Sequence, residues 1–360
     1  MAFSDLRAFI IRYQHQLSIG SFFVGFTIDT IILKRIDLLI SNLLLFTYLS
    51  VVILSMVLLH YAAAHPPRRE WWKRVHLYIP FVAQFAFGGM FSGFLIFYSQ
   101  AGSVIASWPF LLIIVGLLFG NEFLRNYQQR LTYQSLLLFF CFFSFSIYAL
   151  PIFLGRMGDD VFELSGGAAL LLIALFLYLL SFIDHKRVQT SLWNIILGSF
   201  VIYGLITALY FSNTLPPIPL ALKDIGVYHS IERSESDYVA TGEPAPWYAR
   251  YTGVEVHLRP NDVLYAYSSV FAPTNLATSV VHEWQYYDEL RGEWVTEATI
   301  PFPISGGRDG GYRGYTTRAN LRAGLWRINV ETARGQLIGR EVFTVIPSSS
   351  TPALTTRILR

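Results

Sequence analysis

The chain has 360 residues, of which 53% are hydrophobic and only 14% are charged, and its formal net charge is +3. A soluble protein carries roughly 25% charged residues, so this composition excludes an ordinary soluble chain. Neither part of the chain is basic enough to favour nucleic acid as a partner, since residues 1–211 hold 13 Lys and Arg against 9 Asp and Glu, and residues 212–360 hold 14 against 15.

Long apolar runs in the first 211 residues predict a bundle of about seven membrane-spanning helices. The hydrocarbon core of a bilayer is about 30 Å thick, so each span needs roughly 20 residues. The predicted spans are 17–33, 38–64, 79–99, 105–124, 132–154, 168–183 and 195–211. The first runs into "KRID" rather than a small-residue cleavage site, which indicates a span and not a cleaved signal peptide.

Charges in the short loops predict the orientation of the spans. Lys and Arg are retained on the cytoplasmic side of a membrane. With the N-terminus in the cytoplasm, ten basic residues fall on that side and only Lys34, Arg35 and Arg156 on the other. Seven spans then place the C-terminal region outside the cytoplasm, and the resulting expectation is a multi-pass protein of a bacterial inner membrane.

Two acidic residues lie within or at the end of predicted spans. Asp29 is the deepest charge, and a carboxylate at that depth is costly unless it has a partner. It is either a proton or cation site, or a structural contact with Arg35 or a neighbouring helix. Glu122 sits at the end of the fourth span and is expected to meet Arg125 or Asn126 one turn later, rather than to transport a solute.

Other residues of the membrane region indicate packing rather than chemistry. Gly89 and Gly93 have the spacing that lets two helices approach closely. His60, His65 and His76 lack metal-ligand spacing, and no metal or cofactor is expected. The single cysteine, Cys141, excludes an intramolecular disulfide.

After the last span the sequence changes to turn-rich and strand-like segments. "SNTLPPIPL" is a stiff exit from the membrane, because proline fixes φ and cannot continue a helix. Residues 212–240 are expected to form a Pro-containing linker with possible short strands. Residues 241–347 are expected to form the folded domain, and 348–360 a flexible tail.

The folded domain shows the period of two that is typical of strands. "VEVHL", "DVLYAYSSVF", "SVVHEWQYY" and "GEWVTEATI" are rich in β-branched and aromatic residues. A turn from Asp288 to Gly292 predicts one hairpin, and "ARGQ" between "GLWRINVET" and "LIGREVFTVI" predicts a second. Short strands at this spacing predict an antiparallel β-sandwich of Ig-like size.

An arginine-rich, glycine-rich stretch, "GGRDGGYRGYTTRANLRAGLWRINV", is the first candidate binding surface. Arginine beside aromatic residues suits phosphate, carboxylate and sugar rings. The candidate residues are Arg308, Arg313, Arg318, Tyr312 and Tyr315. The alternative is that these arginines pair with acidic residues of the preceding hairpin, in surface ion pairs worth about 0–1 kcal/mol each.

The segment "HEW" is a second candidate. On a strand, His282 and Trp284 share one face, and Glu283 points to the other. His282 and Trp284 either contact a carbohydrate or anion, or belong to a half-buried strand with aromatic cross-strand pairs.

Several of these segments resemble an uncharacterised bacterial family that joins a multi-span N-terminal region to a C-terminal domain of unknown function. The resemblance is carried by "GFTIDTIILKRID", "GNEFLR", "HEW", "GGYRGYTTR", "GLWRINV" and "GQLIGREVFTV". It implies an inner-membrane location and a β-rich end domain, and it implies no activity.

No recognisable catalytic motif is present: there is no G-x-S-x-G, P-loop or H-E-x-x-H. The expectation is therefore a non-enzymatic membrane protein that presents an extracytoplasmic β-sandwich. This domain would bind or sense an envelope component, namely an anionic lipid, a glycan or a protein. The alternative is a small-solute or ion transporter with an accessory periplasmic domain.

Overall fold

The structure of the chain is a computed structural model. It describes residues 26–33, 39–65, 69–75, 78–123, 131–234, 237–244, 253–274, 276–307, 310–350 and 352–359. Two compact units are present, and each is described by itself. Unit 1 comprises residues 1–98, 108–150 and 158–211, and unit 2 comprises residues 99–107, 151–157 and 212–360.

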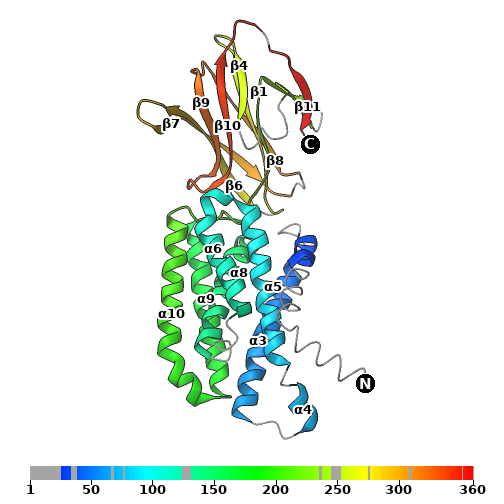
Figure 1. The fold of residues 1–360 in the computed structure, drawn as a ribbon, viewed down its shortest axis with the longest axis vertical. Coiled ribbons are helices and arrows are strands. Elements are labelled where there is room, and N and C mark those ends of the chain that lie inside the picture. Colours follow the sequence, from blue (N-terminus) through cyan, green and yellow to red (C-terminus); the bar gives the residue numbers. More distant parts are fainter. Residues whose placement is uncertain are drawn as a thin grey trace. The chain divides into compact units, whose positions relative to one another are not determined.

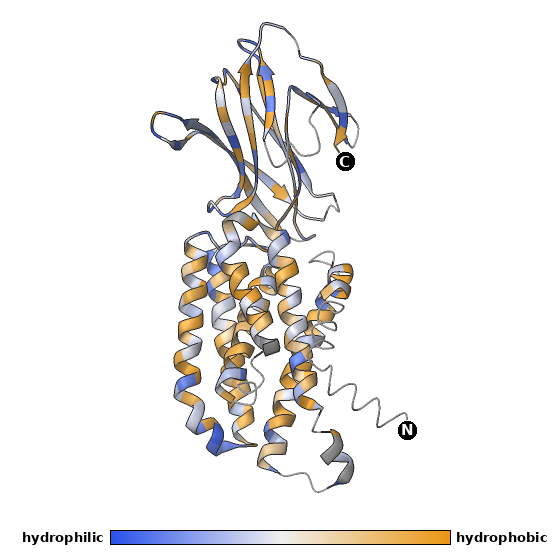
Figure 2. Cartoon of the chain, in the orientation of Figure 1, coloured by the Kyte–Doolittle hydropathy of each residue, from blue (hydrophilic) through white to orange (hydrophobic). Residues whose placement is uncertain are grey.

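Unit 1 is helical (Figure 1). The helices of the described residues are α3 (Leu39–Ala64), α4 (Glu70–Val75), α5 (Ile79–Ala101), α6 (Val104–Phe123), α8 (Leu131–Leu154), α9 (Asp159–Ser181) and α10 (His185–Phe211). Apolar residues dominate all but the short α4, as the orange colouring of Figure 2 shows. A helical, membrane-type N-terminal region is therefore confirmed.

Five of the described helices are long and apolar enough to cross a membrane: α3, α5, α8, α9 and α10. The fourth predicted span, 105–124, corresponds to α6, whose apolar stretch Ala106–Gly120 is shorter. Most of the first predicted span, 17–33, lies outside the described residues. The prediction of seven spans is thus supported for five helices.

The sixth and seventh predicted spans begin too late. In the structure α9 begins at Asp159 rather than at residue 168, and α10 begins at His185 rather than at residue 195. Both helices have polar first turns, which hydropathy assigns to loops. Acidic residues suit the first turn of a helix because they oppose its dipole, so Asp159 and Asp160 belong to α9.

Small residues and polar pairs connect the helices of unit 1. A Cβ atom added at Gly89 would lie 2.6 Å from the ring of Tyr48, and one at Gly93 would lie 2.5 Å from Leu45 Cδ2. These two glycines of α5 thus allow α3 to approach closely, as their spacing predicts. At one end of the bundle, His60 of α3 hydrogen-bonds Gln134 of α8 at 3.2 Å.

Unit 2 contains the strands β1 (Ala221–Tyr228), β2 (Ser230–Ser234), β3 (Asp237–Gly242), β4 (Val254–Leu258), β5 (Val263–Phe271), β6 (Ala277–Asp288), β7 (Glu293–Ser305), β8 (Tyr312–Ala319), β9 (Gly324–Thr332), β10 (Leu337–Pro347) and β11 (Thr355–Leu359). They form a five-stranded sheet in the order β4-β10-β9-β6-β7 and two three-stranded sheets in the orders β1-β5-β8 and β11-β3-β2. All pairings are antiparallel except that of β4 with β10. A β-rich C-terminal unit is therefore confirmed.

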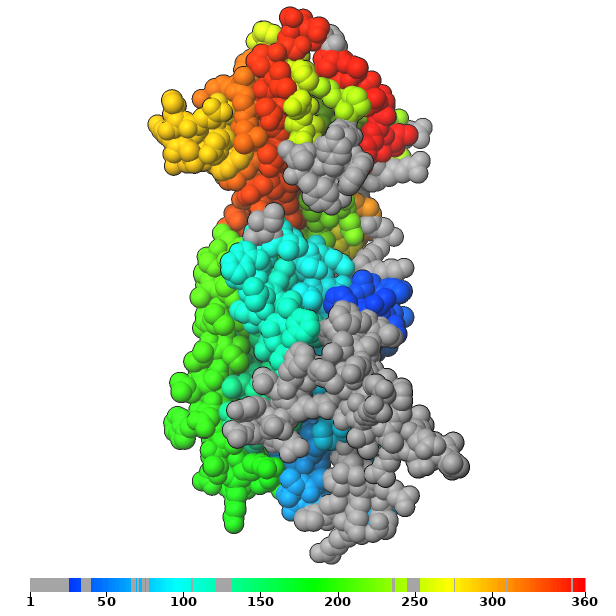
Figure 3. All heavy atoms as spheres, viewed as in Figure 1, coloured from blue at the N-terminus to red at the C-terminus, as the bar shows by residue number. Residues whose placement is uncertain are grey.

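Both predicted hairpins of the five-stranded sheet are present. Gly292 adopts φ of 67° and donates its amide to the carbonyl of Asp288 at 2.8 Å, which closes the turn between β6 and β7. The β6–β7 hairpin projects from the unit in Figures 1 and 3, where it is coloured yellow to ochre. The "ARGQ" turn joins β9 to β10, with Gly335 at φ of 89°. Glycine is favoured at both positions because positive φ is costly for other residues.

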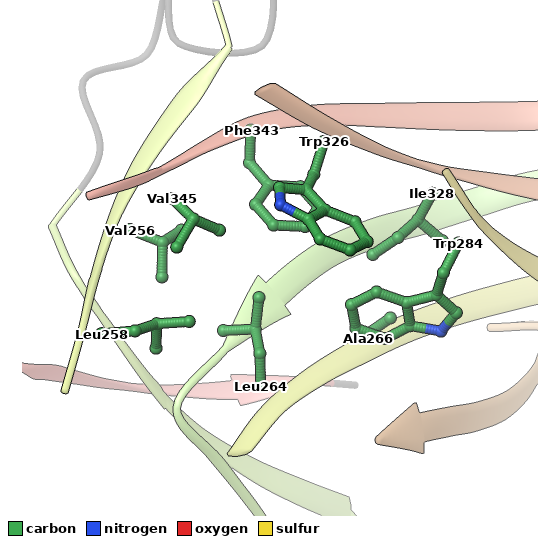
Figure 4. Packing of buried hydrophobic residues seen from close by; sticks show 9 residues of the cluster. All are labelled: Val256, Leu258, Leu264, Ala266, Trp284, Trp326, Ile328, Phe343 and Val345. Carbon is green, nitrogen blue, oxygen red and sulfur yellow. The ribbon is translucent and has the colours of Figure 1, made fainter. Parts of the chain in front are cut away.

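The main core lies between β5 and the five-stranded sheet. Figure 4 shows its members pointing toward one another, with Trp284 of β6 and Trp326 of β9 beside aliphatic side chains of β4 and β5. The cluster comprises Val256, Leu258, Leu264, Ala266, Trp284, Trp326, Ile328, Phe343 and Val345. Alternation along β9 places Trp326, Ile328 and Val330 on this inner face, as the period of two predicts.

The expected linker and tail contribute strands to unit 2. β1 and β2 and most of β3 lie within residues 212–240, and β11 lies within residues 348–360. Leu359 is buried in a cluster with Tyr228, Ile231, Ala240 and Tyr267. The tail is ordered there because a single apolar side chain at the end of "TTRIL" completes that cluster, a signal too short for a periodicity argument.

Candidate ligand site on the outer face of the five-stranded sheet

The outer face of the five-stranded sheet carries polar side chains on its inner strands. Opposite Trp326, Ile328 and Val330, strand β9 presents Arg327, Asn329 and Glu331. The neighbouring β6 adds Glu283 and Gln285, and β10 adds Arg340. We refer to these six residues, Glu283, Gln285, Arg327, Asn329, Glu331 and Arg340, as the outer-face cluster.

Asn329 is the centre of the cluster and is only 2% exposed. Its Nδ2 donates to Glu283 Oε2 at 3.0 Å and to Gln285 Oε1 at 3.2 Å. Its Oδ1 accepts a hydrogen bond from Arg340 Nε at 2.6 Å. The amide therefore connects strands β6, β9 and β10 through side chains as well as through the backbone.

The two arginines of the cluster are held by amides. Arg327 Nε donates to Gln285 Oε1 at 2.5 Å, and its guanidinium carbon lies 4.2 Å from the ring centroid of Trp294 on β7. Among the residues that the structure describes, neither Arg327 nor Arg340 forms a direct ion pair with a carboxylate. Within the described residues these hydrogen bonds use only the Nε of each guanidinium, and guanidinium donors bind planar carboxylates and phosphates.

The protonation of the cluster is shifted by its partial burial. Burial, and then the charge of Arg340, lowers the pKa of Arg327 from 12.5 to about 10, so the side chain stays charged at neutral pH. Burial, together with the nearby Glu283, raises the pKa of Glu331 from 4.5 to about 7. The Glu283 carboxylate is itself fixed by Thr296, whose hydroxyl donates to Oε1 at 2.8 Å. Near neutrality Arg327 is therefore charged, and Glu331 is about half protonated.

The arginines predicted from the glycine-rich stretch lie elsewhere, and the described ones are paired. Arg313 donates to Asp237 Oδ1 and to the carbonyl of Leu359, both at 3.1 Å. Arg318 donates to the carbonyl and to the carboxylate of Glu297, also at 3.1 Å, and Arg322 joins the same carboxylate. Arg318 and Arg322 thus form the predicted pairs with the preceding hairpin, at Glu297 of β7. Arg313 instead pairs with Asp237 of β3, which the sequence did not indicate.

The remaining members of that predicted surface are dispersed. Arg308 lies outside the described residues. Tyr312 packs against the apolar cluster of β5, β6 and β10, and Tyr315 is 42% exposed beside the rings of Tyr238 and Tyr265. The structure therefore does not bring the candidate arginines and tyrosines together into one site.

His282 and Trp284 share one face of β6, as predicted, but that face is the core. Both side chains are fully buried. His282 lies 2.7 Å from the hydroxyl of Ser268 and 3.0 Å from that of Thr316, and Trp284 Nε1 also donates to Thr316 at 3.1 Å. A ligand at the surface cannot reach these groups, so the buried-strand alternative holds for His282 and Trp284 and they are not proposed as binding residues.

The two acidic residues of the membrane region have different outcomes. Asp29 is 4% exposed, and its carboxylate accepts a hydrogen bond from the hydroxyl of Tyr48 at 3.0 Å. This neighbouring-helix contact is one of the two alternatives for Asp29. The side chain of Glu122 lies outside the described residues. Within the described part of the chain, no group of three or more potential ligands is placed to hold a metal ion.

Sequence reasoning missed most of the outer-face cluster, although part of the signal was present. The alternation in "GLWRINVET" already puts Arg327, Asn329 and Glu331 on one face. What it could not provide is the strand order β6-β9-β10, which brings Gln285 and Arg340 beside them. Strand order depends on long-range pairing and is not encoded in local periodicity.

Comparison with known protein families gives a match within unit 2 only, and the matching family has no described activity. A family model described as "Protein of unknown function (DUF2914)" matches residues 277–345, which contain β6 to β9, most of β10 and the whole outer-face cluster. No curated protein matches the chain.

Solved structures with detectable similarity include a β-glucosidase from Listeria innocua in complex with gluconolactone, at 10% identity and a TM-score of 0.19 over 32% of this chain. This chain spans 17% of the glucosidase. Another is an alkylpurine DNA glycosylase from Pseudomonas fluorescens bound to DNA, at 11% identity and a TM-score of 0.21, covering 82% of this chain and 97% of that chain. Scores this low carry no argument about fold or function.

Proposed function

We propose that this chain is a membrane-anchored binding protein whose β-rich unit, an Ig-like sandwich on the extracytoplasmic side of a bacterial inner membrane, holds an acidic envelope glycan. The ligand would contact the outer-face cluster. The supporting observation is that two arginines on adjacent strands, the half-buried Arg327 and the exposed Arg340, are oriented by amide groups and form no direct ion pair with a carboxylate among the described residues.

The geometry favours a ligand with a carboxylate or phosphate. Arg327 and Arg340 project from adjacent strands on one face, since Arg340 pairs with Asn329 and Val342 pairs with Arg327 in the ladder. Their side-chain orientation is set before any ligand arrives, which lowers the entropy lost on binding. A preorganised pair of guanidiniums suits one acidic group between them.

Trp294 makes a sugar the favoured carrier of that acidic group. Its ring packs beside Arg327 on the projecting β6–β7 hairpin and is half-buried. Aromatic rings at the edge of a site provide flat apolar surface against which a sugar ring stacks. An acidic glycan therefore matches both the charge and the shape of this face better than an anionic lipid or a protein does.

The test is a titration of the full chain in nanodiscs with an oligosaccharide that contains glucuronic acid, against a neutral oligosaccharide of equal length. We expect binding only to the acidic one, weakening as salt rises, because exposed charges are screened. Arg327→Gln and Arg340→Gln should each lower affinity by about 10- to 100-fold, since a hydrogen bond to a charged group contributes about 1.5–3 kcal/mol. Arg291→Gln, at the exposed hairpin tip, is the matched control.

The same titration separates the two sets of arginines. If the Arg313→Gln and Arg318→Gln double variant loses binding and the Arg327→Gln variant does not, the site lies at Arg313 and Arg318 and not at the outer-face cluster. Equal binding of the acidic and neutral oligosaccharides, or binding of vesicles with anionic lipid in their place, would reject the proposed ligand class.

A transporter of a small solute or ion is the second candidate. One observation favours it: the carboxyl group of Asp29 is buried among the helices, where it accepts a hydrogen bond from Tyr48. Intramembrane carboxyl groups commonly mark ion or proton paths. Asp29→Asn in reconstituted vesicles would lower a measured flux if this is correct, and would leave expression and assembly unchanged if Asp29 only packs against Tyr48.

A further inference from the structure

The helical hairpin of α9 and α10 encloses a groove that the proposed glycan site does not use. The groove has a volume of about 700 Å³ and lies within unit 1. The two helices contribute residues along much of their length, from Leu170 to Ser181 on α9 and from His185 to Phe200 on α10. Its walls are largely apolar, with Ile173, Leu177 and Leu192 among them.

The length of the groove fits one leaflet of a bilayer. His185 and Phe200 are fifteen residues apart on α10, which corresponds to about 22 Å at 1.5 Å per residue. Half of a bilayer, including its headgroup region, is roughly 20–22 Å thick. A groove of this length that begins at the helix-joining turn, residues 182–184, at the membrane surface would reach about the middle of the bilayer.

The end of the groove at this turn is polar, in contrast to the rest. Ser181, His185 and Gln189 line it there, and Lys186 is exposed next to them. Asp184 lies in the same turn, but its carboxylate accepts the backbone amide of Arg187 at 3.2 Å. The polar end of the groove thus offers hydrogen-bond donors and a positive charge to a lipid headgroup, and the apolar walls offer contacts to an acyl chain.

The outer surfaces of these helices have few protein partners within the described chain. Only 17% of the spanning segment of α10 is buried. Among the described residues, the α10 wall of the groove is therefore largely uncovered, which would let a lipid enter sideways without opening the bundle.

We propose that the groove between α9 and α10 binds one phospholipid with an anionic headgroup. Its acyl chain lies along the apolar walls, and its phosphate is bound at the turn by Lys186 and His185. This site is independent of the outer-face cluster, because it belongs to the other unit and uses different residues.

A photoreactive phosphatidylglycerol, with a diazirine in the middle of its acyl chain, tests the site. The full chain is reconstituted in nanodiscs, irradiated and digested, and we expect labelled peptides from α9 and α10 at the lining positions. Ala174→Trp fills the groove and excludes a few methylene groups of the acyl chain. Labelling there should therefore fall about tenfold, the change in affinity expected from losing their burial. Leu179→Trp is the matched control, since Leu179 is exposed on α9 and does not line the groove.

The headgroup contact has its own test. Lys186→Gln should lower labelling about fivefold with phosphatidylglycerol, as expected when one basic residue is lost near an anionic lipid, and should leave labelling with phosphatidylcholine unchanged. The proposal is overturned if Ala174→Trp labels like wild type, if label is spread evenly over all spans, or if the two lipids label equally. If Ala174→Trp fails to assemble, Ile196→Phe provides a smaller obstruction on the opposite wall.

Discussion

His282 is a buried histidine whose environment requires the neutral ring. Burial lowers its pKa from 6.5 to about 4, and its ring nitrogens meet the hydroxyls of Ser268 and Thr316. The imidazole of His282 takes up a proton near pH 6.5 in the unfolded chain but only near pH 4 in the folded chain. The free energy of unfolding that depends on the neutral ring is therefore fully present above pH 6.5 and is lost as pH falls through 4. We expect urea unfolding of the β-rich unit to show this loss, and His282→Phe to remove it.

The same substitution has a cost at neutral pH. His282→Phe removes the imidazole from the hydroxyl of Ser268 and leaves the hydroxyl of Thr316 with Trp284 alone, which should lower the free energy of unfolding by about 1–3 kcal/mol. A wild-type stability that stays constant between pH 6.5 and pH 4 would contradict the buried neutral ring.

Glu331 has the opposite pH dependence. Its pKa rises to about 7, so between pH 4.5 and pH 7 the folded chain binds more protons than the unfolded chain. The stability due to protonated Glu331 is therefore complete below pH 4.5 and is lost as pH rises through 7. We expect the free energy of unfolding to fall by about 1 kcal/mol between pH 5 and pH 8. This is less than the full pKa shift would give, because Glu331 is only half-buried and solvent screens its charge. Glu331→Gln should remove it, as measured by thermal unfolding at the two pH values, whereas an equal loss in the variant would contradict the assignment.

At the scale of elements, β11 is a structural strand rather than a tail. Leu359 is 1% exposed in the cluster of Tyr228 and Tyr267, while Ile358, one residue earlier, is 54% exposed. We expect Leu359→Ala to lower the free energy of unfolding of the β-rich unit by about 2–4 kcal/mol, as for other buried leucines, and Ile358→Ala to change it by less than about 0.5 kcal/mol. Hydrogen exchange of the β3 amides in the full chain measures both, and equal effects of the two substitutions would show that β11 does not pack.

At the scale of the whole molecule, the predicted orientation puts the turn between α9 and α10 in the cytoplasm and the β6–β7 hairpin outside it. Cys141 is fully buried, so a cysteine introduced elsewhere is the main target for a thiol reagent. We expect a membrane-impermeant maleimide to label Glu289→Cys, at the exposed hairpin tip, in cells whose outer barrier is permeable. Lys186→Cys, in the predicted cytoplasmic loop, should be labelled only after the inner membrane is opened. Labelling of Lys186→Cys in unopened cells, with Glu289→Cys protected, would reverse the orientation.

Local patterns were sufficient for the elements whose signal is continuous along the chain. Hydropathy over about 20 residues identified α3, α5 and α8, because a helix in lipid must be apolar along its whole length. Alternation identified β9, and the positive-φ glycines Gly292 and Gly335 sit in turns that were recognised from sequence. Polar first turns misled the same method at α9 and α10, since hydropathy cannot distinguish a helix end from a loop.

The sequence by itself thus determined a helical membrane region followed by a β-rich unit, since both follow from the period and length of apolar runs. Only the tertiary structure decided what the charged residues do. Arg313 and Arg318 met carboxylates, whereas Arg327 and Arg340 met amides, and nothing in the spacing of arginines distinguishes these cases. The physical reason is that tertiary packing selects the partners of a side chain on a strand. Arg327 and Arg340 contact cross-strand neighbours within one sheet, whereas Arg313 and Arg318 contact carboxylates on strands of other sheets. The order of the strands and the packing of the sheets on one another bring together residues far apart in the chain.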